Sequence, residues 1–187
     1  MIMFSYKQTI AITNSTLYPD NYLQKIEEIA LLQPWAIILR EKNLSEKDYE
    51  TLAKAVMAIC EKQQTKLFLH SYINVAKKLN HTKIHLSLPA LQQHQDEMDF
   101  FQEIGVSVHS LDQAIEAEKL GATYITPGHI FATDCKKGLR PRGLDFLAKI
   151  VKSVKIPVYG IGGISPKNAH EVLATGAKGV AMMSAFK

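Results

Sequence analysis

The sequence predicts a (β/α)8 barrel, that is, a closed parallel sheet of eight strands surrounded by helices. Eight short apolar runs alternate with seven helical patterns along the 187 residues, and strict alternation of strand and helix is typical of a parallel sheet. No linker, low-complexity stretch or composition break divides the chain, so we expect a single domain over residues 1–187. Because the chain is shorter than the roughly 250 residues usual for this fold, its loops must be short.

Each predicted strand is a short run of apolar and β-branched residues, the pattern of parallel strands that are covered on both faces. The strands are predicted at residues 7–13, 35–39, 66–70, 83–86, 105–109, 122–126, 158–161 and 179–183. Pro127 and Gly128 directly follow the sixth strand, and this pair of residues favours a turn over continued extension.

The predicted helices carry apolar residues at helical spacing and have recognisable ends. They are expected at residues 21–32, 46–62, 74–79, 91–103, 111–120, 144–154 and 166–173. Ser45, Ser110 and Ser165 are expected to cap the second, fifth and seventh of them, and Gly121 and Gly176 to end the fifth and seventh. The chain ends soon after the eighth strand, so we expect the eighth helix to be missing or truncated.

The composition excludes several classes of function. A net charge of +4 is too small to indicate a nucleic-acid-binding protein, although it suits a small anionic ligand. No apolar run approaches the ~20 residues that a membrane helix needs, and the first residues do not form a signal peptide. The two cysteines, Cys60 and Cys135, are far apart, which fits a reducing compartment. We therefore expect a cytoplasmic protein with no membrane or nucleic-acid partner.

Polar side chains follow several of the predicted strands. Because the strands of a barrel end at one face, these side chains should converge there. His129 stands at the end of the sixth strand, before a loop that holds Thr133 and Lys136. The other candidates after strands two, three, five, seven and eight are Arg40, Lys42, His70, Ser107, His109, Gly162, Gly163, Met183 and Ser184.

Gly162 and Gly163 predict a phosphate site. Backbone N–H groups after strands seven and eight are the recurrent phosphate site of this fold, and glycine lets the backbone approach an anion closely. We therefore expect an anion at the N–H groups of Gly163 and of Met183 and Ser184.

Two other chemistries are not favoured. Cys135 lies near Lys136 and His129 and could have a lowered pKa, but we interpret it as a bystander in its loop. The histidines show no paired spacing, so the residues alone predict no metal site and no cofactor. His85, on the fourth strand, is expected to lie in the barrel interior.

Two segments carry a specific resemblance. The run GHIFATDCKKG at residues 128–138, together with IPVYGIGGISPKNAHEVLATGAKGVAMMSA at residues 156–185, resembles the thiamine phosphate synthase superfamily, and most closely its thiazole tautomerase (TenI) branch. The resemblance implies a (β/α)8 barrel in thiamine biosynthesis that binds a small thiazole phosphate. Gly162, Gly163, Met183 and Ser184 match its phosphate-binding positions, and Thr133 and Lys136 match the synthase ligand loop.

Departures from the synthase pattern favour the tautomerase branch. In a synthase, carboxylates after strands three and four hold the magnesium that binds a diphosphate, whereas this chain has His70-Ser71-Tyr72 and Ser87-Leu88-Pro89 there. His129 replaces a proline and is the tautomerase signature. The resemblance then implies an isomerase in which His129 moves a proton at neutral pH, while Lys136 or Arg40 pairs with the substrate carboxylate.

Two alternatives remain open. One is a thiamine phosphate synthase, which magnesium dependence would distinguish from the tautomerase. The other is a non-catalytic protein of the same fold that binds thiazole phosphate and has a regulatory role. A barrel without its last helix would also leave an apolar flank, which a homodimer could cover.

Overall fold

In a computed structural model, which describes residues 5–133, 136 and 138–186, eight parallel strands form one sheet in the order β6-β5-β4-β3-β2-β1-β8-β7. The strands are β1 (Thr9–Ile12), β2 (Ala36–Leu39), β3 (Leu67–His70), β4 (Lys83–Ser87), β5 (Glu103–Val108), β6 (Tyr124–Pro127), β7 (Tyr159–Ile161) and β8 (Gly179–Met182). Two isolated parallel bridges, Ile125 to Val158 and Gly128 to Ile161, join β6 to β7. The barrel is therefore nearly closed, and the predicted fold is confirmed.

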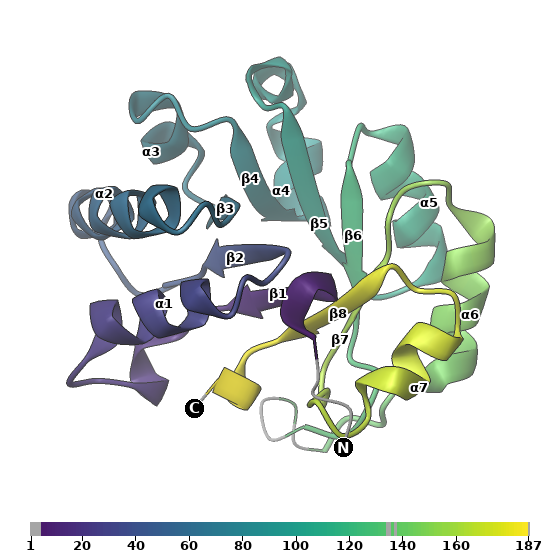
Figure 1. The fold of residues 1–187 in the computed structure, drawn as a ribbon. Coiled ribbons are helices and arrows are strands. Elements are labelled where there is room, and N and C mark those ends of the chain that lie inside the picture. The colour runs from purple at the N-terminus through teal and green to yellow at the C-terminus, as the bar shows by residue number, and fades with distance from the viewer. Residues whose placement is uncertain (1–4, 134–135, 137, 187) are drawn as a thin grey trace.

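The helices lie outside the strands, as Figure 1 shows. They are α1 (Tyr22–Leu31), α2 (Glu46–Lys62), α3 (Ile73–Lys78), α4 (Leu88–Gln93), α5 (Leu111–Lys119), α6 (Gly143–Ser153) and α7 (Ala169–Ala174). The 3-10 turns among the described residues are η1 (Tyr6–Gln8), η2 (Ser15–Leu17), η3 (Gln95–Phe100) and η5 (Ser184–Phe186). The side chains of Ser45 and Ser110 accept the N-cap hydrogen bonds expected at α2 and α5.

Two predicted helices differ in the structure. The helix expected at residues 91–103 is wrong in its bounds, because α4 begins at Leu88, where Ser87 accepts a cap hydrogen bond from Ala90 N and a proline occupies the first turn. The chain then continues as η3, and Glu103 already belongs to β5. Similarly, Ser165 does not cap α7; Ser165 N donates to Asn168 Oδ1 in a turn, and the helix begins only at Ala169.

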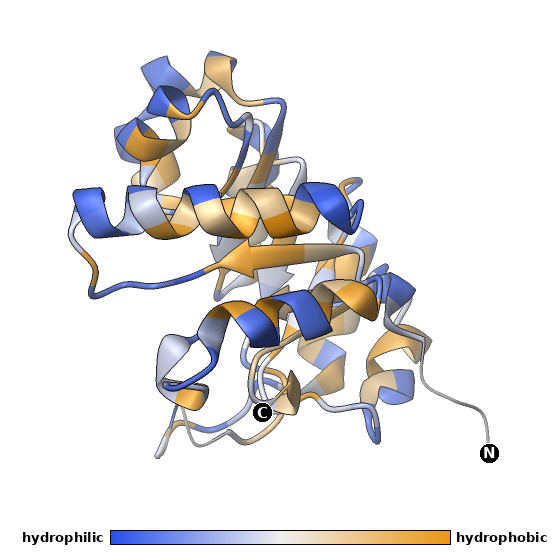
Figure 2. Cartoon of the chain, turned by 60° about the vertical axis from the view of Figure 1, so that its left-hand side comes forward, coloured by the Kyte–Doolittle hydropathy of each residue, from blue (hydrophilic) through white to orange (hydrophobic). Residues whose placement is uncertain are grey.

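The apolar residues form two layers because side chains alternate along each strand. Ile10, Ile12 and Ile38 lie with Phe68 and other buried side chains inside the barrel. The outward-facing residues of the strands, such as Ala11, belong to a larger cluster that they share with the helices. Figure 2 shows the matching hydrophobic and hydrophilic bands along α1 and α2, the two helices nearest the viewer.

The flank beside β8 is covered within the described part of the chain. Val180 and Met182 of β8 are each only 1% exposed. Phe186 of η5 is also buried, and its ring lies 5.6 Å from that of Tyr6 in η1. After β8 the described residues form only η5. Because this flank is covered, an exposed apolar surface no longer supports the predicted homodimer, which stays a prediction.

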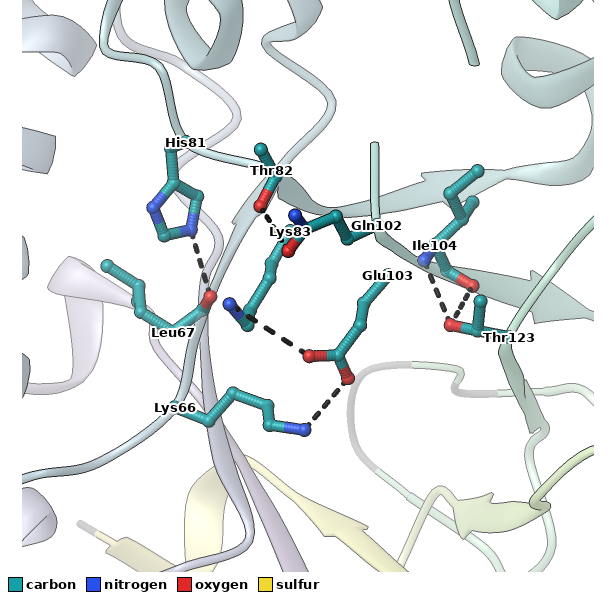
Figure 3. Close-up of polar contacts among 9 residues, drawn as sticks. All are labelled: Lys66, Leu67, His81, Thr82, Lys83, Gln102, Glu103, Ile104 and Thr123. Atoms are coloured by element: carbon teal, nitrogen blue, oxygen red, sulfur yellow. Dashed lines mark hydrogen bonds and ion pairs between the residues drawn. The ribbon is translucent and has the colours of Figure 1, made fainter. Parts of the chain in front are cut away.

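Aromatic and charged side chains fill the barrel at the amino ends of its strands. The Trp35 ring stacks on the ring of Tyr159 at 4.7 Å between centroids, and Lys66 Nζ lies 4.6 Å from the Trp35 centroid. Lys66 Nζ is also 2.8 Å from a Glu103 carboxylate oxygen, and Lys83 Nζ is 4.0 Å from the other (Figure 3). This end of the barrel is therefore packed, and a ligand cavity must lie at the opposite end.

A glycine on β5 makes room for the polar interior. Gly105 pairs in register with His85 of β4 and with Tyr124 of β6. A Cβ atom at this position would collide with the Tyr124 ring and would lie 2.5 Å from His85 Nδ1. The two large side chains can face each other across β5 because this residue has no side chain.

We expect Gly105→Ala to lower the free energy of unfolding by about 1–3 kcal/mol, the usual cost of overpacking a core. The cost should be smaller in a Tyr124→Leu background, which removes the colliding ring atoms and so couples the two sites. Urea unfolding of the four proteins measures this double-mutant cycle. An equal cost of the alanine in both backgrounds would show that the collision is not the cause.

Candidate functional site

A cavity of about 630 Å³ opens at the carboxyl ends of the strands. All twelve residues expected to converge there line it, namely Arg40, Lys42, His70, Ser107, His109, His129, Thr133, Lys136, Gly162, Gly163, Met183 and Ser184. A second cavity of about 590 Å³ shares part of this lining, including Lys136, Gly163 and Ser184. The barrel topology thus brings together residues that lie far apart in the sequence, although their binding and catalytic roles stay predictions.

A buried chain of hydrogen bonds forms the polar part of the cavity floor. Tyr124 Oη lies 2.9 Å from His85 Nδ1, and His85 Nε2 lies 2.9 Å from Ser107 Oγ. Ser107 Oγ is in turn 3.2 Å from Thr126 Oγ1. Burial lowers the pKa of His85 well below its ordinary value and raises the pKa of Tyr124 well above its own, so both groups are neutral near pH 7.

The partners fix the direction of this chain. Among the described residues, Tyr124 Oη has no second hydrogen-bond partner, and a buried hydroxyl hydrogen without an acceptor is costly. Tyr124 therefore donates to His85 Nδ1, and the Nε2–H of His85 donates to Ser107 Oγ. Ser107 keeps its own hydroxyl hydrogen to donate, either to Thr126 or into the cavity. His85 lies in the barrel interior, as expected.

Gly162 and Gly163 follow β7 with positive φ angles of 103° and 66°. A Cβ atom on Gly162 would collide with His129, and one on Gly163 would collide with the carbonyl oxygen of Ala132. The two loops are held together by a 3.0 Å hydrogen bond from Phe131 N to Gly162 O. In the part of the chain that the structure describes, Gly163 N donates no backbone hydrogen bond and is free to face an anion.

Three cationic side chains, Arg40, Lys42 and Lys136, line the same cavity. The Arg40 charge, partial burial and the Lys136 charge, in that order, lower the pKa of Lys42, which shows that like charges act on one another here. Among the described residues, none of the three forms an ion pair. On the described residues alone, this side of the cavity therefore has an unbalanced positive charge.

His129 lies at the edge of the cavity and is only 6% exposed. Its Nε2–H donates to the carbonyl oxygen of Leu139 at 3.3 Å, and its backbone oxygen accepts a 3.0 Å hydrogen bond from Arg142 N. His109, on the neighbouring strand end, donates from Nδ1 to Gly128 O at 3.1 Å. Both imidazoles thus make hydrogen bonds to backbone carbonyl groups around the loop after β6.

Other lining residues were not predicted. Tyr72 belongs to the lining and donates from its hydroxyl to the carbonyl oxygen of Leu44 at 2.7 Å. Thr126 also lines the cavity, and its spacing of two residues from the inward-facing Tyr124 could have identified it. Cys135, which we interpreted as a bystander, lies outside the described residues.

The described residues do not form a metal site. No group of three or more His, Cys, Asp or Glu side chains among them could hold an ion. After β3 the cavity is lined by His70 and Ser71, and after β4 by Ser87. These neutral groups differ from the oxygen-rich, carboxylate-based set that magnesium prefers, so the magnesium of a synthase does not fit the described residues.

The fold and this cavity define a class, that of (β/α)8 barrels with a basic cavity at the carboxyl ends of their strands. The sequence pattern of the family described as thiamine monophosphate synthase matches residues 9–186, and the chain belongs to that family. The thiamine-phosphate synthase of Clostridium acetobutylicum is 33% identical over 182 residues, which cover 96% of this chain and 86% of the relative.

A further similar sequence and a similar solved structure come from Pyrococcus furiosus. Its thiamine-phosphate synthase is 35% identical over 177 residues, which cover 93% of this chain and 84% of the relative. The solved structure of a thiamine phosphate pyrophosphorylase from the same organism has a TM-score of 0.84 and 33% identity, and the match covers 96% of this chain and 87% of that one.

These relatives correct the predicted reaction class. The departures at His70-Ser71-Tyr72 and Ser87-Leu88-Pro89, together with His129, led to an isomerase of the tautomerase type. That assignment is wrong, because the similar proteins over nearly the whole chain are thiamine-phosphate synthases, which are transferases. Among the helices of the described residues, none is long and apolar enough to cross a bilayer.

The histidines at the cavity predict a pH dependence of stability. Burial, followed by the charges of Arg40 and Lys42, lowers the pKa of His70 to about 4, and burial also lowers the pKa of His85 well below its ordinary value. The unfolded chain, with histidine pKa values near 6.5, then binds more protons than the folded protein below that pH. Stability should therefore fall as the pH falls from about 6.5 toward 4, by up to about 1.4 kcal/mol per pH unit for each histidine.

Urea unfolding between pH 6.5 and 5.5 tests this expectation, because the carboxylates with lowered pKa values affect stability only as the pH approaches their unfolded pKa of roughly 4.3. His70→Gln should reduce the slope of the free energy of unfolding against pH. The reduction should be smaller than the roughly 1.4 kcal/mol per pH unit that one fully titrating group contributes, because His70 is only half-buried. The same slope in the variant and in the unmodified protein would contradict the neutral state of His70.

Proposed function

We propose that this chain is a transferase of the thiamine-phosphate synthase type, acting in thiamine biosynthesis. It would join a thiazole phosphate to a pyrimidine that carries a diphosphate and release inorganic diphosphate. The observation that carries the proposal is that two sets of anion-compatible groups line one cavity. The glycines after β7 form one, and the basic side chains Arg40, Lys42 and Lys136 form the other. The names of the relatives support the same reaction.

Each region has a role in the proposal. The backbone around Gly162, Gly163, Met183 and Ser184 would hold the phosphate of the thiazole, and the three cations would hold the diphosphate of the pyrimidine. The thiazole ring nitrogen then forms a bond to the pyrimidine methylene carbon, while the bond from that carbon to the diphosphate oxygen breaks. The leaving diphosphate keeps the electron pair, and the cations stabilise the charge that develops on it.

Ser107, Thr133 and His129 complete the proposed site. The Ser107 hydroxyl can donate to a ring acceptor from the cavity floor, and Thr133 lines the wall beside the phosphate region. In this proposal His129 is a positioning residue, because its ring donates to Leu139 O and so ties the two ends of the loop after β6. The loop that carries Lys136 is thereby held against the cavity.

A non-catalytic protein that binds thiazole phosphate is the second candidate. One observation favours it, namely that the described residues lack a carboxylate cluster able to hold a metal at the diphosphate. The two candidates share the phosphate region and differ in whether diphosphate is ever released.

A diphosphate-release assay with the pyrimidine diphosphate and thiazole phosphate distinguishes the candidates. We expect release with the unmodified protein and a fall in kcat/KM of about 10²–10³-fold in Lys136→Met, which removes a cation from the leaving group. Lys119→Met is the matched control, because it removes an equal charge from the exposed carboxyl end of α5. Binding of thiazole phosphate without any diphosphate release would instead support the non-catalytic protein.

A further inference from the structure

We infer that the three cations Arg40, Lys42 and Lys136 bind a diphosphate group directly, without a bridging divalent metal ion. The identity of the anion rests on the proposed function, whereas the metal independence rests on the side chains around the cavity. Four features of these side chains lead to the inference.

The first feature is the convergence of the cations. Arg40 directly follows the end of β2, Lys42 lies two residues further on, and Lys136 comes from the loop after β6, yet all three line one cavity. The backbone of Arg40 is fixed by a 2.9 Å hydrogen bond from its N–H to Thr13 Oγ1. Cations brought together in this way repel one another, and an anion between them removes that repulsion.

The second feature is the position of the neighbouring carboxylate. Glu41 stands between Arg40 and Lys42 in the sequence but is only 6% exposed. Its oxygens accept hydrogen bonds from Thr13 Oγ1 at 3.0 Å, from Ser15 Oγ at 2.7 Å and from the Tyr22 hydroxyl at 2.7 Å. Glu41 therefore neither neutralises the cations by an ion pair nor lines the cavity as a metal ligand.

The third feature is the chemistry of the strand ends after β3 and β4. His70 is neutral near pH 7, and Ser71 Oγ lies 2.8 Å from its Nδ1. Ser87 Oγ accepts the cap hydrogen bond of α4 from Ala90 N at 3.3 Å. These groups offer no negative charge, and magnesium is held in proteins chiefly through carboxylate oxygens.

The fourth feature is the sign of the local potential. A divalent ion placed among three positive side chains is repelled by each of them, and no described carboxylate in the cavity lining offsets this repulsion. Arginine and lysine can instead donate charge-assisted hydrogen bonds to the diphosphate oxygens. Magnesium in solution would then weaken binding, because it lowers the negative charge of the free diphosphate.

Calorimetric titration with inorganic pyrophosphate tests the inference, with EDTA or with excess magnesium chloride at constant ionic strength. We expect binding in EDTA and weaker binding in magnesium. Lys42→Met should raise the Kd in EDTA by about tenfold, as expected for the loss of one charged hydrogen-bond donor. Lys119→Met, the charge-matched control, should change the Kd by less than about twofold, since exposed distant charges are screened by salt.

The inference is overturned by pyrophosphate binding that requires magnesium, by no binding in either solution, or by equal Kd values for Lys42→Met and Lys119→Met. The last outcome would place pyrophosphate at the glycines after β7. Because calorimetry needs no turnover, pyrophosphate binding in EDTA without any diphosphate release from the substrates would reject the transferase and leave the metal-independent anion site in place.

Discussion

The seam between β6 and β7 is the constraint on which the rest of the site depends. Two isolated bridges join these strands, and beyond them the chain at Gly162 and Gly163 approaches His129 and Ala132 so closely that no side chain fits. This contact brings the loop after β6, and with it Lys136, to the same opening as the glycines. Closure of the sheet and assembly of the cavity are therefore one structural event rather than two.

The charges at the opening are arranged to leave positive potential exposed. Glu41 is adjacent in sequence to two cations but uses its carboxylate to hold η2 and α1 in place. The protein thus keeps a carboxylate near the cations for structure while leaving their charge available to a ligand. Such an arrangement is unfavourable for the empty protein and becomes favourable when an anion binds, which is typical of preorganised sites.

Much of the fold could be predicted because the eight strands are short apolar runs separated by clear helix ends. The site could be located for the same reason, since residues such as Arg40 and Ser184 follow strands whose ends must meet at one face. The break between α4 and η3 was missed, because the apolar pattern of residues 91–103 continues through it. The reaction class was misjudged because the missing carboxylates and His129 were interpreted as a change of chemistry. Relatives over nearly the whole chain indicate a transferase instead.

The packed aromatic end of the barrel restricts the route by which ligands reach the cavity. Trp35, Phe68, Tyr124 and Tyr159 fill the interior at the amino ends of the strands, so any ligand must enter and leave through the opposite mouth. Two ligands that occupy the cavity together then use the same opening, at the carboxyl ends of the strands. In the proposed function, both substrates would therefore enter and both products would leave on the side of the barrel where Ser107 and the cations line the cavity.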